Sequence, residues 1–162
     1  MIELKDITHV FNPNSVDERL ALRHINLKVN EGDFITIIGS NGAGKTTLFN
    51  IIAGTYTPTS GKIFINGIDV TNDPEYKRAR YIGRIFQNPL LGTASNMSLE
   101  DNMMICYRKG FKWPVVSLNR SMRELFKKEL ARLQMGLEHR MKDNLALFSG
   151  GQRQALTLLM MV

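Results

Sequence analysis

The sequence is poor in cysteine and in long apolar runs. Cys106 is its single cysteine, so a disulfide within the chain is excluded and a reducing compartment is indicated. No apolar run approaches the roughly 18 residues that a membrane-spanning helix needs, so we expect a chain that does not cross a bilayer. The segment Met1–Asp6 lacks the cationic and apolar regions of a signal peptide, which favours a cytoplasmic protein.

Two kinds of site are also missing from the sequence. No histidines, cysteines and carboxylates show the spacing of a metal cage, and no Gly-x-Ser-x-Gly elbow indicates a serine hydrolase. The chain has 162 residues, of which 43% are hydrophobic and 22% charged. That composition is typical of one globular domain with a sizeable core.

The net charge of +6 is concentrated in the second half of the chain. Residues 75–142 hold 14 Lys and Arg against 6 Asp and Glu, whereas the remaining residues hold 7 against 9. A basic half is found in proteins that contact nucleic acid, an anionic membrane or an acidic partner. A solvated helical face explains it as well and is the simpler interpretation.

Hydrophobic patterning predicts strands in the first half of the chain and helices in the second. Residues 34–38 are apolar and mostly β-branched, which is typical of a strand buried on both faces. Asn66-Gly67 lies between two apolar runs and predicts a tight hairpin. We expect strands at 25–29, 34–38 and 81–86, a hairpin at 61–70, a helix at 45–53 that Gly54 ends, and an amphipathic helix over 118–133.

A glycine-rich segment joins the predicted strand 34–38 to the predicted helix 45–53. It fits the P-loop pattern in full, with Gly39, Ser40, Asn41, Gly42, Ala43, Gly44, Lys45 and Thr46. Glycines let successive backbone N–H groups point at phosphate oxygens, and the start of the helix adds a partial positive charge. We expect Lys45 to reach the β- and γ-phosphates and Thr46 to bind Mg²⁺, and we assign Thr47 to the same site. The pattern predicts a nucleotide site but not the class of protein.

A second motif follows much later in the chain. The segment Phe148–Gln154 reads Phe-Ser-Gly-Gly-Gln-Arg-Gln, and its Ser149 lies 104 residues after Lys45. Taken alone, this segment is typical of a helix N-terminus with a capping serine. Taken with the P-loop at this distance, it resembles the signature Leu-Ser-Gly-Gly-Gln of the ATP-binding-cassette (ABC) ATPases, with Phe148 in place of the leucine. The resemblance covers essentially the whole chain.

The resemblance implies an α/β fold, namely a P-loop NTPase with a RecA-like core, an antiparallel β-subdomain and a helical subdomain. We place the ATP-binding core with the β-subdomain in residues 1–86, and the Q-loop and helical subdomain in residues 87–162. In this family the signature of one subunit caps the γ-phosphate held by the P-loop of another, so a head-to-tail dimer is expected. The signature residues so implied are Ser149, Gly150, Gly151 and Gln152.

Two further positions match the family. Gln87 resembles the glutamine of the Q-loop, which contacts Mg²⁺ and the attacking water; the alternative is a polar residue at a strand end. Phe11 lies 28 residues before Gly39, where the family places an aromatic residue that stacks on adenine. An aromatic residue of the core or of a turn is the alternative at that position.

One part of the family pattern is missing from the sequence. The family has a Walker B strand beyond the signature helix, ending in an aspartate for Mg²⁺ and a glutamate that acts as general base. Only 10 residues follow Gln152 here, so we expect an incomplete ABC nucleotide-binding domain whose P-loop strand lacks neighbours. Loss of a general base commonly costs about 10²–10⁴ in rate, so we expect little or no ATP hydrolysis from this chain.

The resemblance favours the ATP-binding subunit of a membrane transporter, most similar to bacterial importers, with ATP and Mg²⁺ as cofactors. The partners then expected are a second ABC subunit, permease subunits and a substrate-binding protein at the inner face of the cell membrane, with no nucleic acid. Two alternatives stay open. One is a soluble ABC ATPase that acts on nucleic acid or ribosomes through the basic half. The other is a nucleotide-binding module that does not hydrolyse ATP.

Overall fold

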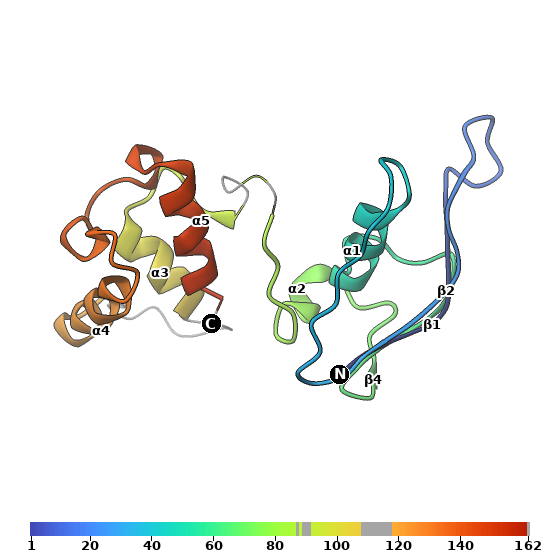
Figure 1. Ribbon diagram of the computed structural model, residues 1–162, viewed down its shortest axis with the longest axis horizontal. Coiled ribbons are helices and arrows are strands. Elements are labelled where there is room, and N and C mark those ends of the chain that lie inside the picture. Colours follow the sequence, from blue (N-terminus) through green and yellow to red (C-terminus); the bar gives the residue numbers. More distant parts are fainter. Residues whose placement is uncertain (87, 89–91, 108–117, 162) are drawn as a thin grey trace. The chain divides into compact units, whose positions relative to one another are not determined.

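The computed structural model describes residues 1–86, 88, 92–107 and 118–161 (Figure 1). The chain forms two compact units, Met1–Ile82 and Gly83–Val162. The first unit combines strands and helices, whereas the elements described in the second are all helical. Each unit has a hydrophobic core of its own.

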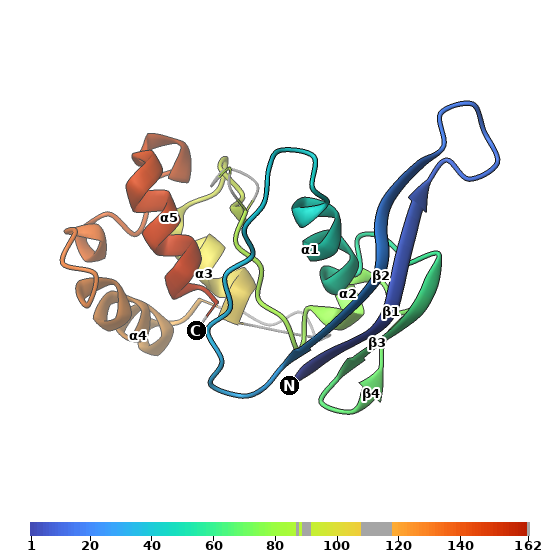
Figure 2. The same cartoon turned by 45° about the vertical axis from the view of Figure 1, so that its right-hand side comes forward.

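The first unit is built on a four-stranded antiparallel sheet. Its strands are β1 (Ile2–Phe11), β2 (Arg19–Val29), β3 (Ser60–Ile65) and β4 (Ile68–Asp69), in the order β2-β1-β3-β4 (Figure 2). The predicted hairpin is confirmed, because β3 pairs with β4 around Asn66 and Gly67, whose φ angles are 51° and 79°. Two positive φ angles in a two-residue turn give the twist that the flanking strands need.

Helix α1 (Lys45–Ala53) contributes the other half of this unit's core. Leu48 and Ile51 are buried and pack with apolar residues of the sheet. The helix ends as predicted, since Gly54 adopts a left-handed φ of 88° and its N–H bonds to the last turn. A single turn, α2 (Glu75–Arg78), follows later. The buried residues of the core are Leu4, Ile7, Leu22, Leu48, Ile51, Ile63, Ile65 and Val70.

The prediction of a buried strand at 34–38 is wrong. Residues 34–38 form no strand, and the exposed fractions of Phe34 and Ile38 are 95% and 90%. A parallel strand needs hydrogen-bonded neighbours, and no described segment of the chain pairs with this one. The strand predicted at 81–86 is likewise absent. Segment 34–38 has the composition of a strand, but composition alone does not supply the neighbouring strand with which it would have to pair.

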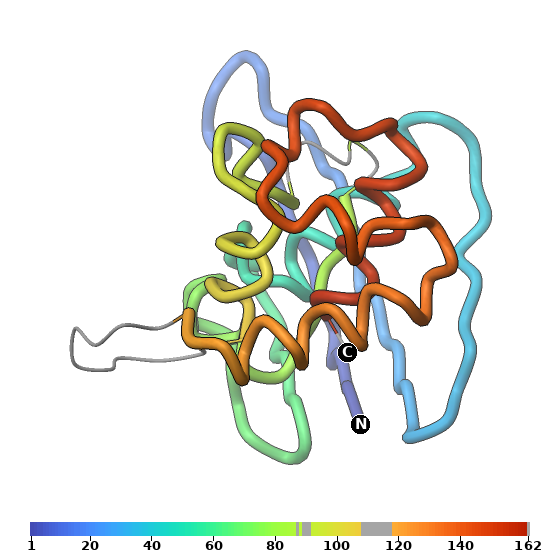
Figure 3. Tube along the Cα trace, turned by 90° about the vertical axis from the view of Figure 1, so that its left-hand side faces the viewer, coloured from blue at the N-terminus to red at the C-terminus, as the bar shows by residue number. Residues whose placement is uncertain are grey.

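The second unit is a cluster of helices, drawn in yellow, orange and red in Figure 3. Its helices are α3 (Leu99–Tyr107), α4 (Arg120–Ala131) and α5 (Gly150–Leu159), with two 3₁₀ turns at Leu137–His139 and Leu145–Leu147. Helix α4 confirms the predicted amphipathic helix, because Phe126 and Leu130 are buried while its basic residues face outward. None of the described helices is long and apolar enough to cross a membrane.

Candidate phosphate-binding site

The P-loop leads directly into α1. Gly44 occupies the position before the helix with a φ of 85°, and no side chain caps the first turn. The first turn of α1 also contains no acidic residue. The N–H groups of an uncapped helix start, together with the helix dipole, attract an anion. The local structure therefore has the electrostatics that phosphate binding requires.

Lys45 bends back over the loop from which α1 starts. Its Nζ atom donates to the backbone oxygen of Gly39 at 2.6 Å and to that of Ser40 at 2.7 Å. The loop is closed further by a hydrogen bond from the Ala43 N–H to the Ser40 oxygen, at 3.2 Å. The ammonium group is thus held at the loop that the motif assigns to phosphate.

Gly44 is required by both its backbone and its neighbours. A Cβ atom at this position would lie 2.7 Å from the backbone oxygen of Ala21 and 2.9 Å from Cδ2 of Leu22, both on β2. Strand β2 therefore passes directly against the end of the loop. Gly42 also has a left-handed φ, of 84°, and Nη2 of Arg19 lies 3.5 Å from where its Cβ would be. The start of β2 thus forms one wall of the loop.

Phe11 ends β1 opposite Arg19, the first residue of β2. Its half-buried ring makes edge contacts with His9 at a centroid distance of 4.6 Å and with Tyr56 at 5.5 Å. Pairing of β1 with β2 therefore places Phe11 and Gly42 beside the same arginine. Stacking of Phe11 on adenine stays a prediction, and its aromatic neighbours match the alternative of a packed aromatic residue.

The residues predicted to bind magnesium are described only in part. Thr46 lies exposed in the first turn of α1, with half-buried Thr47 beside it, whereas Gln87 lies outside the described residues. No group of three His, Cys, Asp or Glu side chains among the described residues could hold a metal ion. The Thr46 hydroxyl together with phosphate oxygens is a donor set that would suit Mg²⁺ at this loop.

The signature segment forms the start of α5. The Ser149 hydroxyl accepts the Gln152 N–H at 3.3 Å, and the Gln152 side-chain oxygen accepts the Ser149 N–H at 3.0 Å. This reciprocal pair is a capping box, as expected of a helix N-terminus with a capping serine. Phe148 is buried beneath the guanidinium of Arg140, whereas Gly150 and Gly151 are exposed. Binding of a nucleotide by these residues stays a prediction.

Ser149→Ala should lower the free energy of unfolding by about 1 kcal/mol, because one N–H of α5 loses its acceptor. Urea unfolding followed by circular dichroism measures the change. Ser121→Ala is the matched control, since Ser121 is exposed inside α4 and caps nothing. Equal stability of Ser149→Ala and the native chain would contradict the capping role.

Sequence reasoning missed two arginines, Arg19 and Arg78. The Arg78 side chain is 1% exposed and donates to four backbone oxygens. Its acceptors are Ile51 at 2.7 Å, Ile52 at 3.0 Å, Thr71 at 2.9 Å and Asp73 at 2.9 Å. The guanidinium thus satisfies carbonyls at the end of α1, where the helix dipole is negative. Burial lowers the pKa of the Arg78 guanidinium, and the nearby Asp73 carboxylate partly offsets this effect.

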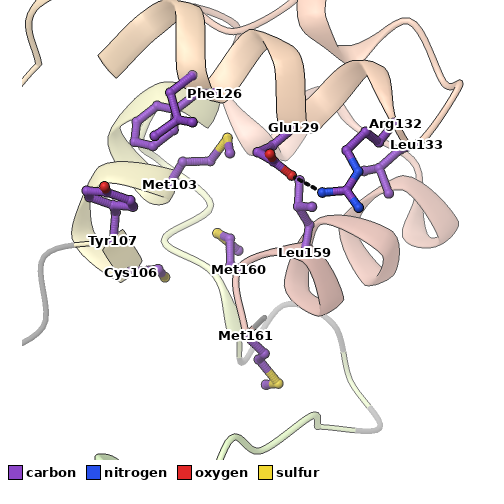
Figure 4. Close-up of a pocket in the computed structure, with 11 residues that line it drawn as sticks. Met103, Cys106, Tyr107, Phe126, Glu129, Arg132, Leu133, Leu159, Met160 and Met161 are labelled. Atoms are coloured by element: carbon purple, nitrogen blue, oxygen red, sulfur yellow. Dashed lines mark hydrogen bonds and ion pairs between the residues drawn. The ribbon is translucent and has the colours of Figure 1, made fainter. Parts of the chain in front are cut away.

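A pocket of about 730 Å³ lies in the second unit (Figure 4). Its walls are mostly apolar, with Met103 and Tyr107 from α3, Phe126 from α4, and Met160 just after α5. The ion pair of Glu129 and Arg132, at 2.7 Å, lies at one side. None of the residues that the sequence predicts to bind nucleotide lines this pocket.

Comparison with known proteins identifies relatives of the whole chain. Residues 22–162 match the protein family described as "ABC transporter". The tyrosine transport ATP-binding protein of Clostridioides difficile is 34% identical over 165 residues, covering 99% of this chain. The Fe(3+) ions import ATP-binding protein of Escherichia coli O157:H7 is 33% identical over 159 residues, covering 97% of this chain.

Solved structures show the same fold. A dimeric ATP-binding cassette in a post-hydrolysis state, bound to ADP and Pi, superposes with a TM-score of 0.76 at 27% identity, over 100% of this chain and 69% of the other. The chain spans 64% of the length of the tyrosine transport protein and 40% of that of the ferric ion protein. The shared fold is therefore that of an ATP-binding cassette, of which this chain covers a part.

Proposed function

Because this chain belongs to the ABC transporter family, we propose that it binds ATP as the nucleotide-binding subunit of a membrane transporter. The observation that carries the proposal is the uncapped, acid-free start of α1 behind a loop that fits the P-loop pattern in full. Lys45, held at that loop, supplies the cation that the β- and γ-phosphates need.

Each part of the loop has one task in binding. Backbone N–H groups of the loop and of the first turn of α1 donate to phosphate oxygens. When ATP binds, the Lys45 ammonium exchanges its hydrogen bonds to Gly39 and Ser40 for bonds to the phosphates. The ammonium group therefore stays at the loop with and without nucleotide. Mg²⁺, when bound through the Thr46 hydroxyl, neutralises phosphate charge. The pairing of Phe11 with Arg19, beside the loop wall, supports Phe11 as the residue that covers the base.

We propose that this chain by itself binds ATP but hydrolyses it slowly. Hydrolysis needs a base within hydrogen-bond reach of the attacking water. Residues 39–53, which comprise the loop and α1, contain no carboxylate. The loop and α1 therefore offer no carboxylate of their own to act as that base.

The proposed partners follow from what the relatives are. The superposable cassette is dimeric, which supports a second ABC subunit, with its signature segment facing this P-loop. The ferric ion relative is an import protein, which supports permease subunits, a substrate-binding protein and a place at the inner face of the cell membrane. The two relatives are named for different solutes, tyrosine and ferric ions. We therefore propose import but assign no solute.

Titration of Mg-ATP into the purified chain by calorimetry tests the proposal. We expect saturable binding that Lys45→Ala weakens at least tenfold, because the charge-assisted bonds to the phosphates are lost. Lys28→Ala is the control, since it removes an exposed lysine from β2 of the same unit. Absence of saturable ATP binding in a chain that still melts cooperatively would refute the proposed function.

A further inference from the structure

Arg19 stands at the meeting point of the strand pair and the P-loop. It is the first residue of β2 and the cross-strand neighbour of Phe11. Its Nη2 atom lies 3.5 Å from the position that a Cβ atom on Gly42 would occupy. The guanidinium group thus lies next to the space beside Gly42, in the middle of the loop. The motif that identifies the loop does not include this residue.

The Arg19 guanidinium pairs with none of the residues that the structure describes. Its nearest acidic neighbour in sequence, Glu18, accepts the Asn14 N–H at 2.8 Å inside the loop between β1 and β2. Among the described residues, no hydrogen bond, ion pair or ring contact engages the Arg19 side chain. An exposed cation with five N–H donors therefore lies beside the loop, and none of the residues that the structure describes pairs with it.

We infer that Arg19 binds the polyphosphate of the nucleotide from the β2 side of the loop, whereas Lys45 binds it from the first turn of α1. This inference rests on the proposed nucleotide binding and adds a residue to it. The loop and α1 contain one lysine and no arginine, whereas Mg-free ATP carries several negative charges. A planar guanidinium suits phosphate oxygens because two of its N–H groups can bond to one phosphate.

The exposure of Arg19 sets the size of the effect. Attraction between an exposed cation and a phosphate is weakened by water and by salt. We expect Arg19→Gln to raise the Kd for ATP roughly five- to tenfold in about 0.05 M salt. In about 1 M salt, where the screening length falls to about 3 Å, the same ratio should shrink below about twofold. Arg19→Lys should retain part of the affinity.

Arg23→Gln provides the matched control. Arg23 is an exposed arginine on the same strand and lies four residues further along, about 13 Å at the rise of a β-strand. The Arg23→Gln substitution removes one positive charge from β2, as Arg19→Gln does, but leaves the guanidinium beside the loop in place. We expect its Kd for ATP to stay within about twofold of the native value at low salt.

Calorimetric titration with ATP at both salt concentrations tests whether Arg19 binds the polyphosphate. The proteins compared are the native chain, Arg19→Gln, Arg19→Lys and Arg23→Gln, and thermal melts check that each is folded. A salt-dependent loss confined to Arg19→Gln supports the inference. A loss that is equal at both salt concentrations would assign Arg19 to packing against the base instead and overturn it. Native affinity in Arg19→Gln overturns it while leaving nucleotide binding intact. Failure of the native chain to bind ATP refutes the proposed function itself.

Discussion

Arg78→Met is expected to lower the free energy of unfolding by about 3–5 kcal/mol. Methionine has a similar reach but offers no donors, so four backbone oxygens lose a charge-assisted bond at once. Two of these oxygens, on Ile51 and Ile52, belong to the last turn of α1. Relief from burying the guanidinium offsets a part of the loss, because burial disfavours the charged form. Urea unfolding followed by circular dichroism measures the difference.

Arg80→Met is the control for Arg78→Met. Arg80 is exposed; its Nε atom donates to the Lys77 oxygen, and its guanidinium lies 5.7 Å from the centre of the exposed Tyr81 ring. Its replacement should change the free energy of unfolding by less than about 0.5 kcal/mol. Equal stability of the two variants would show that Arg78 does not stabilise the end of α1. The backbone oxygens that it bonds would then have to accept hydrogen bonds from water.

Gly44→Ala is expected to lower the free energy of unfolding by about 2–4 kcal/mol and to abolish ATP binding. The left-handed φ of 85° alone costs an alanine about 1 kcal/mol or somewhat more. The new methyl group also meets the Ala21 oxygen at 2.7 Å, so β2 and the start of α1 must move apart. Such a movement spoils the loop geometry that aligns the phosphate-binding N–H groups. Urea unfolding and calorimetric titration with Mg-ATP measure the two effects.

Gly32→Ala separates backbone strain from steric conflict. Gly32 has nearly the same φ, 83°, but no atom lies within 4 Å of where its Cβ would be. It should therefore lose only about 1 kcal/mol and keep its affinity for ATP. A similar loss of stability in Gly32→Ala and Gly44→Ala would mean that β2 does not press against the loop.

The elements that sequence reasoning predicted well are those specified by neighbouring residues. The hairpin turn needs only Asn66 and Gly67, the end of α1 needs Gly54, and the start of α5 needs Ser149 with Gln152. In each case, a few consecutive residues supply both the conformation and the hydrogen bonds. Local chemistry of this kind can be read from a single sequence.

The misses are elements that depend on distant partners. Strand β1 was not predicted, because irregularities in its pairing after Leu4 and Ile7 break the alternation of buried and exposed residues. The opposite error occurred at 34–38, where the apolar pattern was present but no partner strand was. Strand formation is a property of pairs, so one segment's composition cannot settle it.

The residues of the candidate site also fall into two groups, those that a local motif predicts and those that depend on distant partners. The glycines, Lys45 and Thr46 form one continuous motif, and the motif predicts their chemistry. Arg19 lies 23 residues before Gly42, and the pairing of β1 with β2 brings it to the loop. Arg78 lies 32 residues after Thr46, and packing brings it to the end of α1. No local pattern distinguishes them from other surface arginines, so the structure was needed to find them.

The segment 34–38, in which every residue except the half-buried Ile37 is exposed, also affects how the protein behaves in concentrated solution. Phe-Ile-Thr-Ile-Ile is uncharged and mostly β-branched, and its backbone is paired with no described strand. Short segments of this kind stack into cross-β assemblies when they meet their own copies. Loss of active protein on storage or heating would then follow the rate of such stacking and rise with protein concentration. A charged residue at Thr36 would act as a gatekeeper against that route.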